Sequence, residues 1–439
     1  MNSLQIFLPC AAGVEDLLAA EVHDLTGLMG QDLLTRRGGV MARASWRDAM
    51  LLNLHSRLAQ RVLVQLSYTD YRNEQDLYRA ASDVAWEVWF TPKQSIKVEV
   101  TAQHSPLNSL NFAALKIKDA VCDRFRDKAH GVRPDVNTQW PDVRIYAHLT
   151  TDTCSLYIDT SGEPLFKRGW REDKGEAPLK ETLAAAMIAA CGWAEGDDDL
   201  LPLYDPCCGS GTIAIEAAQI ACNIAPGSLR RFAFEKYVPF QPHVWAAIKQ
   251  DAADAVVKPE PGQKALIYGS DVSHRMVDFA QRNAERAGVA DVVEFRGGDA
   301  LQRMPPTDIA GVMLLNPPYG ERIAVGGVAA GVPPRSAVSR VAAPHGGEFP
   351  LGRPGGELPH QFVAREAAQT EDGGEFFSQL ATHWKKNYSG WTGWILTPDL
   401  KLPSKMRLKE SRRVPMWNGP IECRMFRFDM VKGTAREKK

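Results

Sequence analysis

The run Asn316-Pro317-Pro318-Tyr319 is the part of the sequence best suited to carry chemistry. It follows a continuous apolar stretch, residues 309–315, which predicts a buried strand. Because proline fixes φ and has no N–H, a backbone carbonyl and the Asn316 side-chain oxygen can act as two convergent acceptors. Two such acceptors suit the exocyclic amine of a planar base, whose nitrogen becomes pyramidal in the transition state. Tyr319 offers a ring for stacking; the alternative is a rigid turn after a strand.

A glycine-rich turn, residues 205–212 (DPCCGSGT), lies between a predicted strand at 201–204 and a predicted helix at 212–222. Gly209 and Gly211 allow a tight turn and the close approach of a ligand. The start of the helix offers unpaired N–H groups to an anionic group. Many such turns use glycine for packing alone, but the order of strand, Asp205, glycines and helix favours a cofactor-binding turn.

Two further aspartates follow the next predicted strands. Asp271 comes after the strand at 265–268, where it can accept hydrogen bonds from ribose hydroxyls or cap the helix at 273–287. Asp299 follows the strand at 292–295 and can accept from an adenine amino group or serve as a turn residue. The 60 residues from Gly211 to Asp271 far exceed the ~20 of a dinucleotide site. An NAD site therefore fits poorly unless residues 223–262 form an excursion.

The elements around these residues predict an α/β fold. Strands alternate with helices from residue 201 to residue 396, which indicates a mostly parallel, doubly wound sheet. Asn418-Gly419, between two strand-like runs, predicts a terminal antiparallel hairpin. Upstream, small α+β segments are predicted, with helices at 14–25, 48–66 and 111–126 and strands at 96–101, 143–149 and 154–159. Residues 326–360 hold eight glycines and six prolines and read as a flexible insertion.

Composition agrees with a multidomain globular protein. The 439 residues suggest about three domains. No apolar stretch approaches the ~20 residues of a membrane span, and we see no signal peptide, so the expected compartment is the cytoplasm. The eight cysteines form no C-x-x-C pair, which predicts reduced thiols and no metal site. Net charge is −1, but residues 401–439 hold twelve Lys/Arg against four Asp/Glu, a local balance of +8; this is either a solvated tail or a nucleic-acid patch.

Along the chain, the four motifs are the glycine-rich turn, Asp271, Asp299 and the Asn316-Pro317-Pro318-Tyr319 run. With the motifs in that order, the chain resembles the S-adenosylmethionine-dependent amino-methyltransferases, and most closely the bacterial 23S ribosomal RNA guanine-N2 methyltransferases of the RlmL type. Residues 105–126, 141–144, 159–162 and 167–171 (KRGWR) resemble a THUMP domain and its exit, and residues 178–184 resemble the lead-in helix of the catalytic domain. The resemblance covers residues 1–322 and 375–433. It implies a ferredoxin-like domain at 1–66, an RNA-binding THUMP domain at 67–165 and a Rossmann-like methyltransferase domain at 166–439. The chain ends at Lys439, which leaves room for one catalytic domain.

The resemblance also implies roles for individual residues. S-adenosyl-L-methionine would be the cofactor, with Asp271 on its ribose, Asp299 on its adenine and the remaining contacts at its methionine end from Asp205, Gly209, Gly211, Lys180 and Thr182. The target guanine would be held by Asn316, Pro317, Pro318 and Tyr319. Ribosomal RNA, from the large subunit or its precursor, would meet basic residues of the helix at 111–126 and of the connection after it: Lys116, Lys118, Arg124, Arg126, Lys167, Arg168 and Arg171. Neither a strong base nor a metal is needed, because proximity to a sulfonium donor can supply most of the rate.

Other functions stay open at this point. The NPPY run also suits a methyltransferase acting on tRNA guanine N2 or on adenine N6 in DNA or RNA. A protein of a different class, an RNA-binding assembly factor with weak or lost catalysis, is less favoured because all four motifs are intact. The THUMP resemblance favours RNA over DNA, and a monomer is expected.

Overall fold

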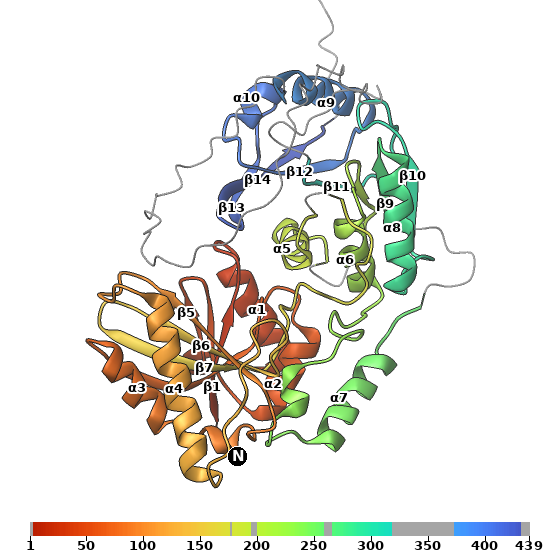
Figure 1. Cartoon of the computed structure of the whole chain (residues 1–439). Helices are drawn as coiled ribbons and strands as arrows, with labels where there is room; N and C mark the ends of the chain where they lie inside the picture. The colour runs from red at the N-terminus through yellow and green to blue at the C-terminus, as the bar shows by residue number, and fades with distance from the viewer. Residues whose placement is uncertain (1–2, 176–177, 195–199, 259–265, 318–372, 432–439) are drawn as a thin grey trace, which may run out of the picture.

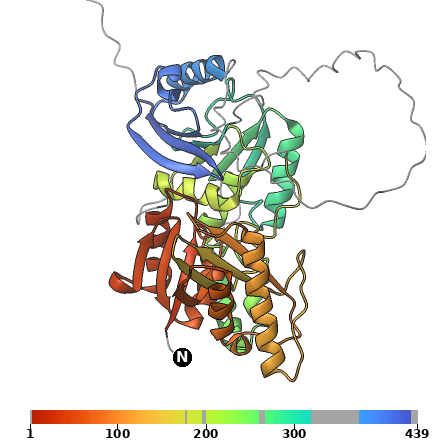
Figure 2. The ribbon, with the colours of Figure 1, turned by 60° about the vertical axis from the view of Figure 1, so that its left-hand side comes forward.

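The computed structural model describes residues 3–175, 178–194, 200–258, 266–317 and 373–431. The chain forms two halves, each built on a seven-stranded sheet (Figure 1). The same two halves are seen from a second side in Figure 2. None of the helices in this described part of the chain is long and apolar enough to cross a membrane.

The N-terminal half is built on one mixed sheet. Its strands are β1 (Leu4–Pro9), β2 (Leu33–Arg36), β3 (Gly39–Ala44), β4 (Leu63–Asp70), β5 (Ile96–Ala102), β6 (Val143–Leu149) and β7 (Thr153–Asp159). They lie in the order β2-β3-β1-β4-β7-β6-β5, and only β5 and β6 pair in parallel. The expected division between residues 66 and 67 falls inside β4, so the first two segments share a single sheet.

The helices of this half are α1 (Glu15–Thr26), α2 (Trp46–His55), α3 (Glu74–Asp83) and α4 (Leu110–Lys128), with 3₁₀ turns at Gly30–Asp32 and Trp86–Val88. The helix predicted over residues 48–66 was wrong in its second part. A capping box of Ser45 and Asp48 starts α2, and the backbone turns extended at Ser56. The apolar residues that follow belong to β4, where Val64 pairs with Ile158 of β7. Their non-local partners in the sheet outweigh the helical spacing.

The C-terminal half confirms the predicted α/β sheet. Its strands are β8 (Leu203–Asp205), β9 (Ile267–Asp271), β10 (Val293–Gly297), β11 (Val312–Leu315), β12 (Thr392–Thr397), β13 (Arg412–Asn418) and β14 (Ile421–Asp429). In the order β10-β9-β8-β11-β12-β14-β13, the first five are parallel and β14 is antiparallel to both its neighbours. The predicted hairpin is present, with Asn418 opposite Ile421.

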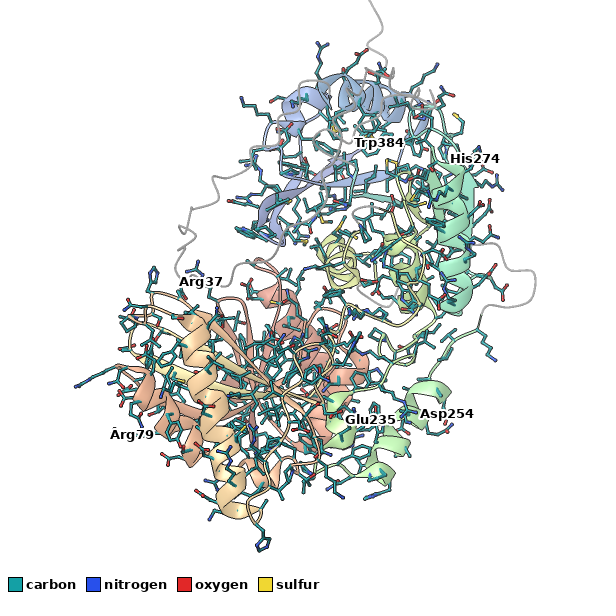
Figure 3. All side chains as sticks on the ribbon, in the orientation of Figure 1. Arg37, Arg79, Glu235, Asp254, His274 and Trp384 are labelled. Carbon is teal, nitrogen blue, oxygen red and sulfur yellow. The ribbon has the colours of Figure 1, made fainter. Side chains whose placement is uncertain are left out.

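Helices cover this second sheet. They are α5 (Glu181–Cys191), α6 (Thr212–Ala221), α8 (His274–Arg286), α9 (Gly373–Asn387) and α10 (Leu402–Met406). Trp384 of α9 is labelled in Figure 3 and is buried; a Cβ on Gly393 of β12 would lie 2.5 Å from its ring. That glycine therefore lets α9 approach the sheet closely. All eight cysteines are free, as expected.

One helix of the C-terminal half packs on the N-terminal half. After α6 the chain leaves the C-terminal sheet and forms a 3₁₀ turn (Ala233–Lys236) and α7 (Pro242–Asp254), which lies beside α2 in Figure 1. Trp245 of α7 meets the Phe234 ring at 5.0 Å, and Phe234 meets Trp46 of α2 at 6.3 Å. This excursion accounts for the long spacing between Gly211 and Asp271.

Buried charges join the two halves. Arg168, in the connection between them, donates through Nε to Glu216 Oε1 of α6 at 3.0 Å and through Nη2 to the Arg57 carbonyl at 2.8 Å. The side chains of Arg168 and Glu216 are 1% and 0% exposed. Because an unpaired charge at such depth costs several kcal/mol, this arrangement fixes the connection firmly against α6.

Candidate active site

The turn after β8 has the conformation that its glycines predict. Asp205 Oδ1 accepts a hydrogen bond from the Cys207 N–H at 3.0 Å. Gly209 and Gly211 have φ values of 53° and 88°, in the left-handed region that favours glycine. A Cβ on Gly211 would come within 3.0 Å of Ala280 Cβ, whereas a Cβ on Gly209 would meet no described atom within 4 Å. Gly211 thus permits tight packing against α8, and the space beside Gly209 is open to a ligand.

Asp271, 60 residues downstream, lies against this turn. Its Oδ2 accepts from the Gly209 N–H at 3.0 Å and its Oδ1 from the Ser273 N–H at 2.8 Å. The N-cap position of α8 is Ser273, so Asp271 supports the start of that helix from two residues before it. Each carboxylate oxygen has a second lone pair, which leaves capacity for ligand hydroxyls. The structure therefore brings the glycine turn and Asp271 into direct contact.

Burial disfavours negative charge at this edge of the sheet. Desolvation raises the pKa of Asp205 to about 8, with the nearby Asp271 carboxylate adding to the effect. Desolvation also raises the pKa of Asp271, against the two backbone hydrogen bonds that lower it. A positively charged ligand group placed here would favour the ionised carboxylates.

Asp299 lies at the same edge. β9 and β10 pair in parallel with Asp271 opposite Gly297, so Asp299 follows two residues beyond that pair. Its Oδ1 accepts from the Leu301 N–H at 2.9 Å, which makes it a turn residue in the structure. This contact does not exclude a ligand on its second oxygen.

Asn316 and Pro317 follow β11, the neighbour of β8 on the other side. Carboxyl ends of parallel strands share one edge of a sheet, so these residues lie at the edge that carries Asp205 and Asp271. Asn316 Oδ1 is buried and has no hydrogen-bond partner among the described residues. An unsatisfied buried acceptor costs about 1–3 kcal/mol, which a ligand N–H would recover. Pro318 and Tyr319 lie outside the described residues.

Arg171 does not face solvent as an RNA contact would. Its Nε donates to Glu181 Oε1 at 2.7 Å, its Nη1 to Ser210 Oγ at 2.9 Å and its Nη2 to Thr212 Oγ1 at 2.7 Å. It therefore ties the start of α5 to the glycine turn. Local sequence carries no signal for this role, because the basic run KRGWR looks like a surface patch.

The structure corrects two more of the expected RNA contacts. Arg168 is buried with Glu216, and so has no surface to offer RNA. Arg124 of α4 is held by both oxygens of Glu87, at 2.8 and 2.6 Å, and by the Ser82 carbonyl. Both guanidinium groups are occupied by partners that lie far away in the sequence.

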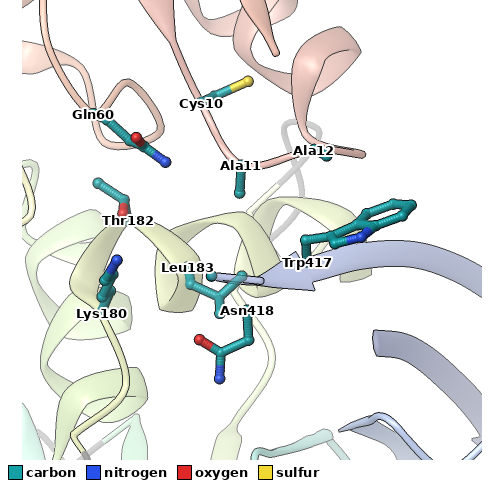
Figure 4. A pocket seen from close by; sticks show the side chains of 10 residues that line it. Cys10, Ala11, Ala12, Gln60, Lys180, Thr182, Leu183, Trp417 and Asn418 are labelled. Atoms are coloured by element: carbon teal, nitrogen blue, oxygen red, sulfur yellow. The ribbon is translucent and has the colours of Figure 1, made fainter. Parts of the chain in front are cut away.

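The remaining basic residues are more accessible. Lys116 lies over the exposed Phe112 ring at 5.4 Å, Lys118 pairs with Asp119, and Arg126 and Lys167 are each half exposed in pairs with carboxylates three and four residues away. Such surface pairs are weak and can exchange for phosphate. Lys180 and Thr182, at the start of α5, line a cavity that faces the N-terminal half (Figure 4).

Comparison with known proteins identifies the parts of this architecture. Residues 5–63 match the RlmL ferredoxin-like domain, residues 71–159 the THUMP domain, and residues 168–328 the RMKL-like methyltransferase domain. The chain therefore carries a methyltransferase domain behind ferredoxin-like and THUMP domains. S-adenosyl-L-methionine is the cofactor that this domain implies.

Individual relatives agree. The ribosomal RNA large subunit methyltransferase K/L of Psychromonas ingrahamii is 34% identical over 96% of this chain and 49% of its own length, and that of Shewanella amazonensis is 34% identical over 95% and 52%. The chain thus spans about half the length of these relatives. The crystal structure of SMU.472, a methyltransferase complexed with SAH, superposes with a TM-score of 0.77 at 25% identity and covers 99% of this chain and 100% of that one.

The residues present fit such a cofactor. The open space beside Gly209 and the carboxylate oxygens of Asp271 suit a ligand with ribose hydroxyls. The Asn316 Oδ1, which lacks a partner among the residues that the structure describes, lies at the same edge and can accept a hydrogen bond from a ligand N–H.

Proposed function

We propose that this protein transfers a methyl group from S-adenosyl-L-methionine to the exocyclic N2 amine of a guanine in 23S ribosomal RNA. The observation that carries the proposal is the buried Oδ1 of Asn316, which has no hydrogen-bond partner in the described part of the chain, at the sheet edge that holds Asp205 and Asp271. An amine N–H donated to this oxygen would remove the cost of the unsatisfied acceptor. The THUMP match and the names of the relatives support large-subunit ribosomal RNA as the substrate.

In this mechanism the protein binds the cofactor and the target base and aligns them, and no residue acts as a strong general base. Asp205, Asp271, Asp299, Gly209 and Gly211 hold the cofactor, which supplies a methyl group on a sulfonium when bound. Asn316, with Pro317, Pro318 and Tyr319, positions the guanine amine for attack. The new N–C bond forms as the S–C bond breaks, S-adenosylhomocysteine is released and the amine proton passes to water. Alignment of this kind is a large contribution to rate.

We further propose that the protein acts as a monomer in the cytoplasm and that the target base leaves its stack. The base must reach Asn316 at the sheet edge, so unpaired or loosely paired RNA should be the better substrate. Mass-spectrometric mapping of ribosomal RNA from a deletion strain identifies the modified nucleotide. A missing N2-methylguanine in 23S RNA supports the proposal; a missing tRNA N2-methylguanine or N6-methyladenine contradicts it.

Asn316→Ala tests the mechanism. Loss of one acceptor in the transition state should slow single-turnover methyl transfer by about 10²–10³. Cofactor affinity, measured by calorimetry, should change little, because Asn316 is assigned to the target amine. Asn316→Asp is the matched variant, since it retains an oxygen at the Oδ1 position, and it should be faster than Asn316→Ala. A rate for Asn316→Ala within threefold of the wild type would reduce the run to a structural turn.

A further inference from the structure

A cavity of about 180 Å³ lies where three distant parts of the chain meet (Figure 4). The loop after β1 and Gln60 come from the N-terminal half, Lys180 and Thr182 from the start of α5, and Trp417 from the tip of the β13–β14 hairpin. The backbone N–H of Trp417 donates to the Ala12 carbonyl at 3.2 Å and fixes the hairpin against the N-terminal half. The cavity is smaller than the ~300–1,000 Å³ of a typical small-molecule site, so it suits one part of a larger ligand.

The lining combines the groups that recognise a nucleotide. Lys180 is exposed, its Nζ lies 5.3 Å from the centre of the Phe166 ring, and no carboxylate among the described residues pairs with it. An unpaired ammonium suits a phosphate, and the indole of Trp417 suits the face of a base. The amide of Gln60 and the hydroxyl of Thr182 can pair with base edges or the ribose 2′-OH.

None of the described residues that line the cavity is acidic, so no carboxylate there would repel a phosphate. Cys10 is the titratable group that the N-terminal half contributes, and burial raises its pKa to about 12, so it stays a neutral thiol. Glu15 and Glu21, the acids that add to this shift, do not line the cavity. On the hairpin, Arg424 lies 5.9 Å from the centre of the Trp417 ring, but its guanidinium pairs with Glu422 at 2.6 Å and so adds little net charge there.

The cavity also adjoins the cofactor turn. Glu181, between Lys180 and Thr182 in the sequence, points the other way and pairs with Arg171, which holds Ser210 and Thr212 of the turn. Residues on either side of Glu181 therefore face the junction of the two halves, while Glu181 faces the glycine turn. The cavity and the glycine turn thus lie on two sides of the same short segment at the start of α5.

We infer that the junction cavity binds a nucleotide of the RNA strand beside the target base. This inference rests on the proposed function, and it gives Lys180 and Thr182 a role toward RNA in place of the methionine contact that family resemblance implies for them. The reason is geometric, because both side chains line the junction cavity.

Lys180→Ala tests this assignment against a matched control. Lys249→Ala removes another exposed lysine that lies over an aromatic ring, Trp245 at 5.5 Å, on α7 and outside the cavity. Filter binding of protein-free 23S ribosomal RNA across a salt series should show, for Lys180→Ala, a log–log salt slope shallower by about 0.7, the loss of one single-strand phosphate contact. Lys249→Ala should keep the wild-type slope, and both variants should keep wild-type cofactor affinity by calorimetry.

Trp417→Ala gives a second, independent reading. Loss of one stacking platform should weaken RNA binding at least about fivefold, and the backbone bond from residue 417 to Ala12 remains available. Lower cofactor affinity with unchanged RNA binding in Lys180→Ala would return Lys180 to the methionine end and overturn the inference, as would no change in either. Because these are binding measurements, they read the cavity even if the wild type methylates a different RNA, which would overturn the proposed function alone.

Discussion

The two sheets of this protein use their polar residues in different ways. In the C-terminal sheet, Asp205, Asp271 and Asn316 lie at the ends of neighbouring strands and gather at one edge, and the Asn316 Oδ1 has no partner among the described residues. In the N-terminal sheet and its helices, many charged side chains are already paired, as in Arg61 with Asp159, Arg144 with Glu99 and Arg124 with Glu87. The C-terminal sheet thus has a buried acceptor without a partner among the described residues, while the N-terminal half uses these charged side chains to hold its own elements together.

This difference shows that the position of a polar residue in the fold predicts its role better than its charge does. In open α/β sheets, ligands bind in the crevice outside the carboxyl ends of the parallel strands, so a polar residue at a strand end has a position that the sequence can predict. A cluster of basic residues is no such place, because each guanidinium can find a carboxylate from another element. Function is therefore easier to infer for the strand ends than for the arginines.

The largest effect should come from Arg168, for which the family resemblance implies an RNA contact. Arg168→Met leaves Glu216 buried with only the more distant Arg57, at 3.7 Å. Removing one partner of a buried pair typically costs about 3–5 kcal/mol, so the free energy of unfolding should fall by that amount in urea titrations followed by tryptophan fluorescence.

The adjacent residue supplies the control. Lys167 pairs with Glu163 at 2.6 Å, but both side chains are about half exposed, and such pairs are worth about 0–1 kcal/mol. Lys167→Met should therefore leave the unfolding midpoint nearly unchanged. Equal effects of the two substitutions would mean that the Arg168–Glu216 pair does not stabilise the joint between the halves.

Local patterns predicted much of the fold but not its long-range pairings. The order of strands and helices after residue 201 and the Asn418-Gly419 hairpin were confirmed, because spacing and turn residues determine them locally. The extension of α2 to residue 66 was wrong, because Val64 is held by Ile158, 94 residues away in the chain. The excursion that carries α7 could be proposed only as a way to explain spacing, since its aromatic partners lie in the first half.

The same limit applies to the site. The glycine turn, Asp271 and Asn316 stand at strand ends where sequence reasoning put them. Arg171 and Glu181 were not recognised as supports of the turn, because their hydrogen bonds connect segments that are about 10 and 40 residues apart. The ligand roles of the glycine turn, Asp271 and Asn316 remain predictions. One substitution in each half of the molecule tests the comparison between the two sheets.

On the catalytic side, Asp271→Ala should weaken cofactor binding more than tenfold. Hydrogen bonds to a charged group are worth about 1.5–3 kcal/mol each, and the carboxylate is proposed to hold the ribose while it supports Gly209 and Ser273. Asp278→Ala, at an exposed position of α8, is the control and should bind normally in calorimetry. Unchanged affinity in a folded Asp271→Ala variant would leave Asp271 with its two backbone contacts as its only role.

The smallest effect should appear on the N-terminal side, within one helix. Arg124 and Arg126 lie about 200° apart on a helical wheel, and the structure pairs Arg124 with Glu87 while Arg126 is half exposed. If only accessible cations meet RNA, Lys116→Gln/Lys118→Gln/Arg126→Gln should flatten the salt dependence of 23S RNA binding by up to about 0.9 per lost contact, between about 50 and 200 mM salt. Arg124→Gln should leave the slope unchanged and lower stability instead. If Arg124→Gln flattens the salt slope and the triple variant keeps the wild-type slope, pairing in the structure does not decide which cations bind RNA. If both variants keep the wild-type slope, the basic C-terminal segment becomes the leading RNA anchor.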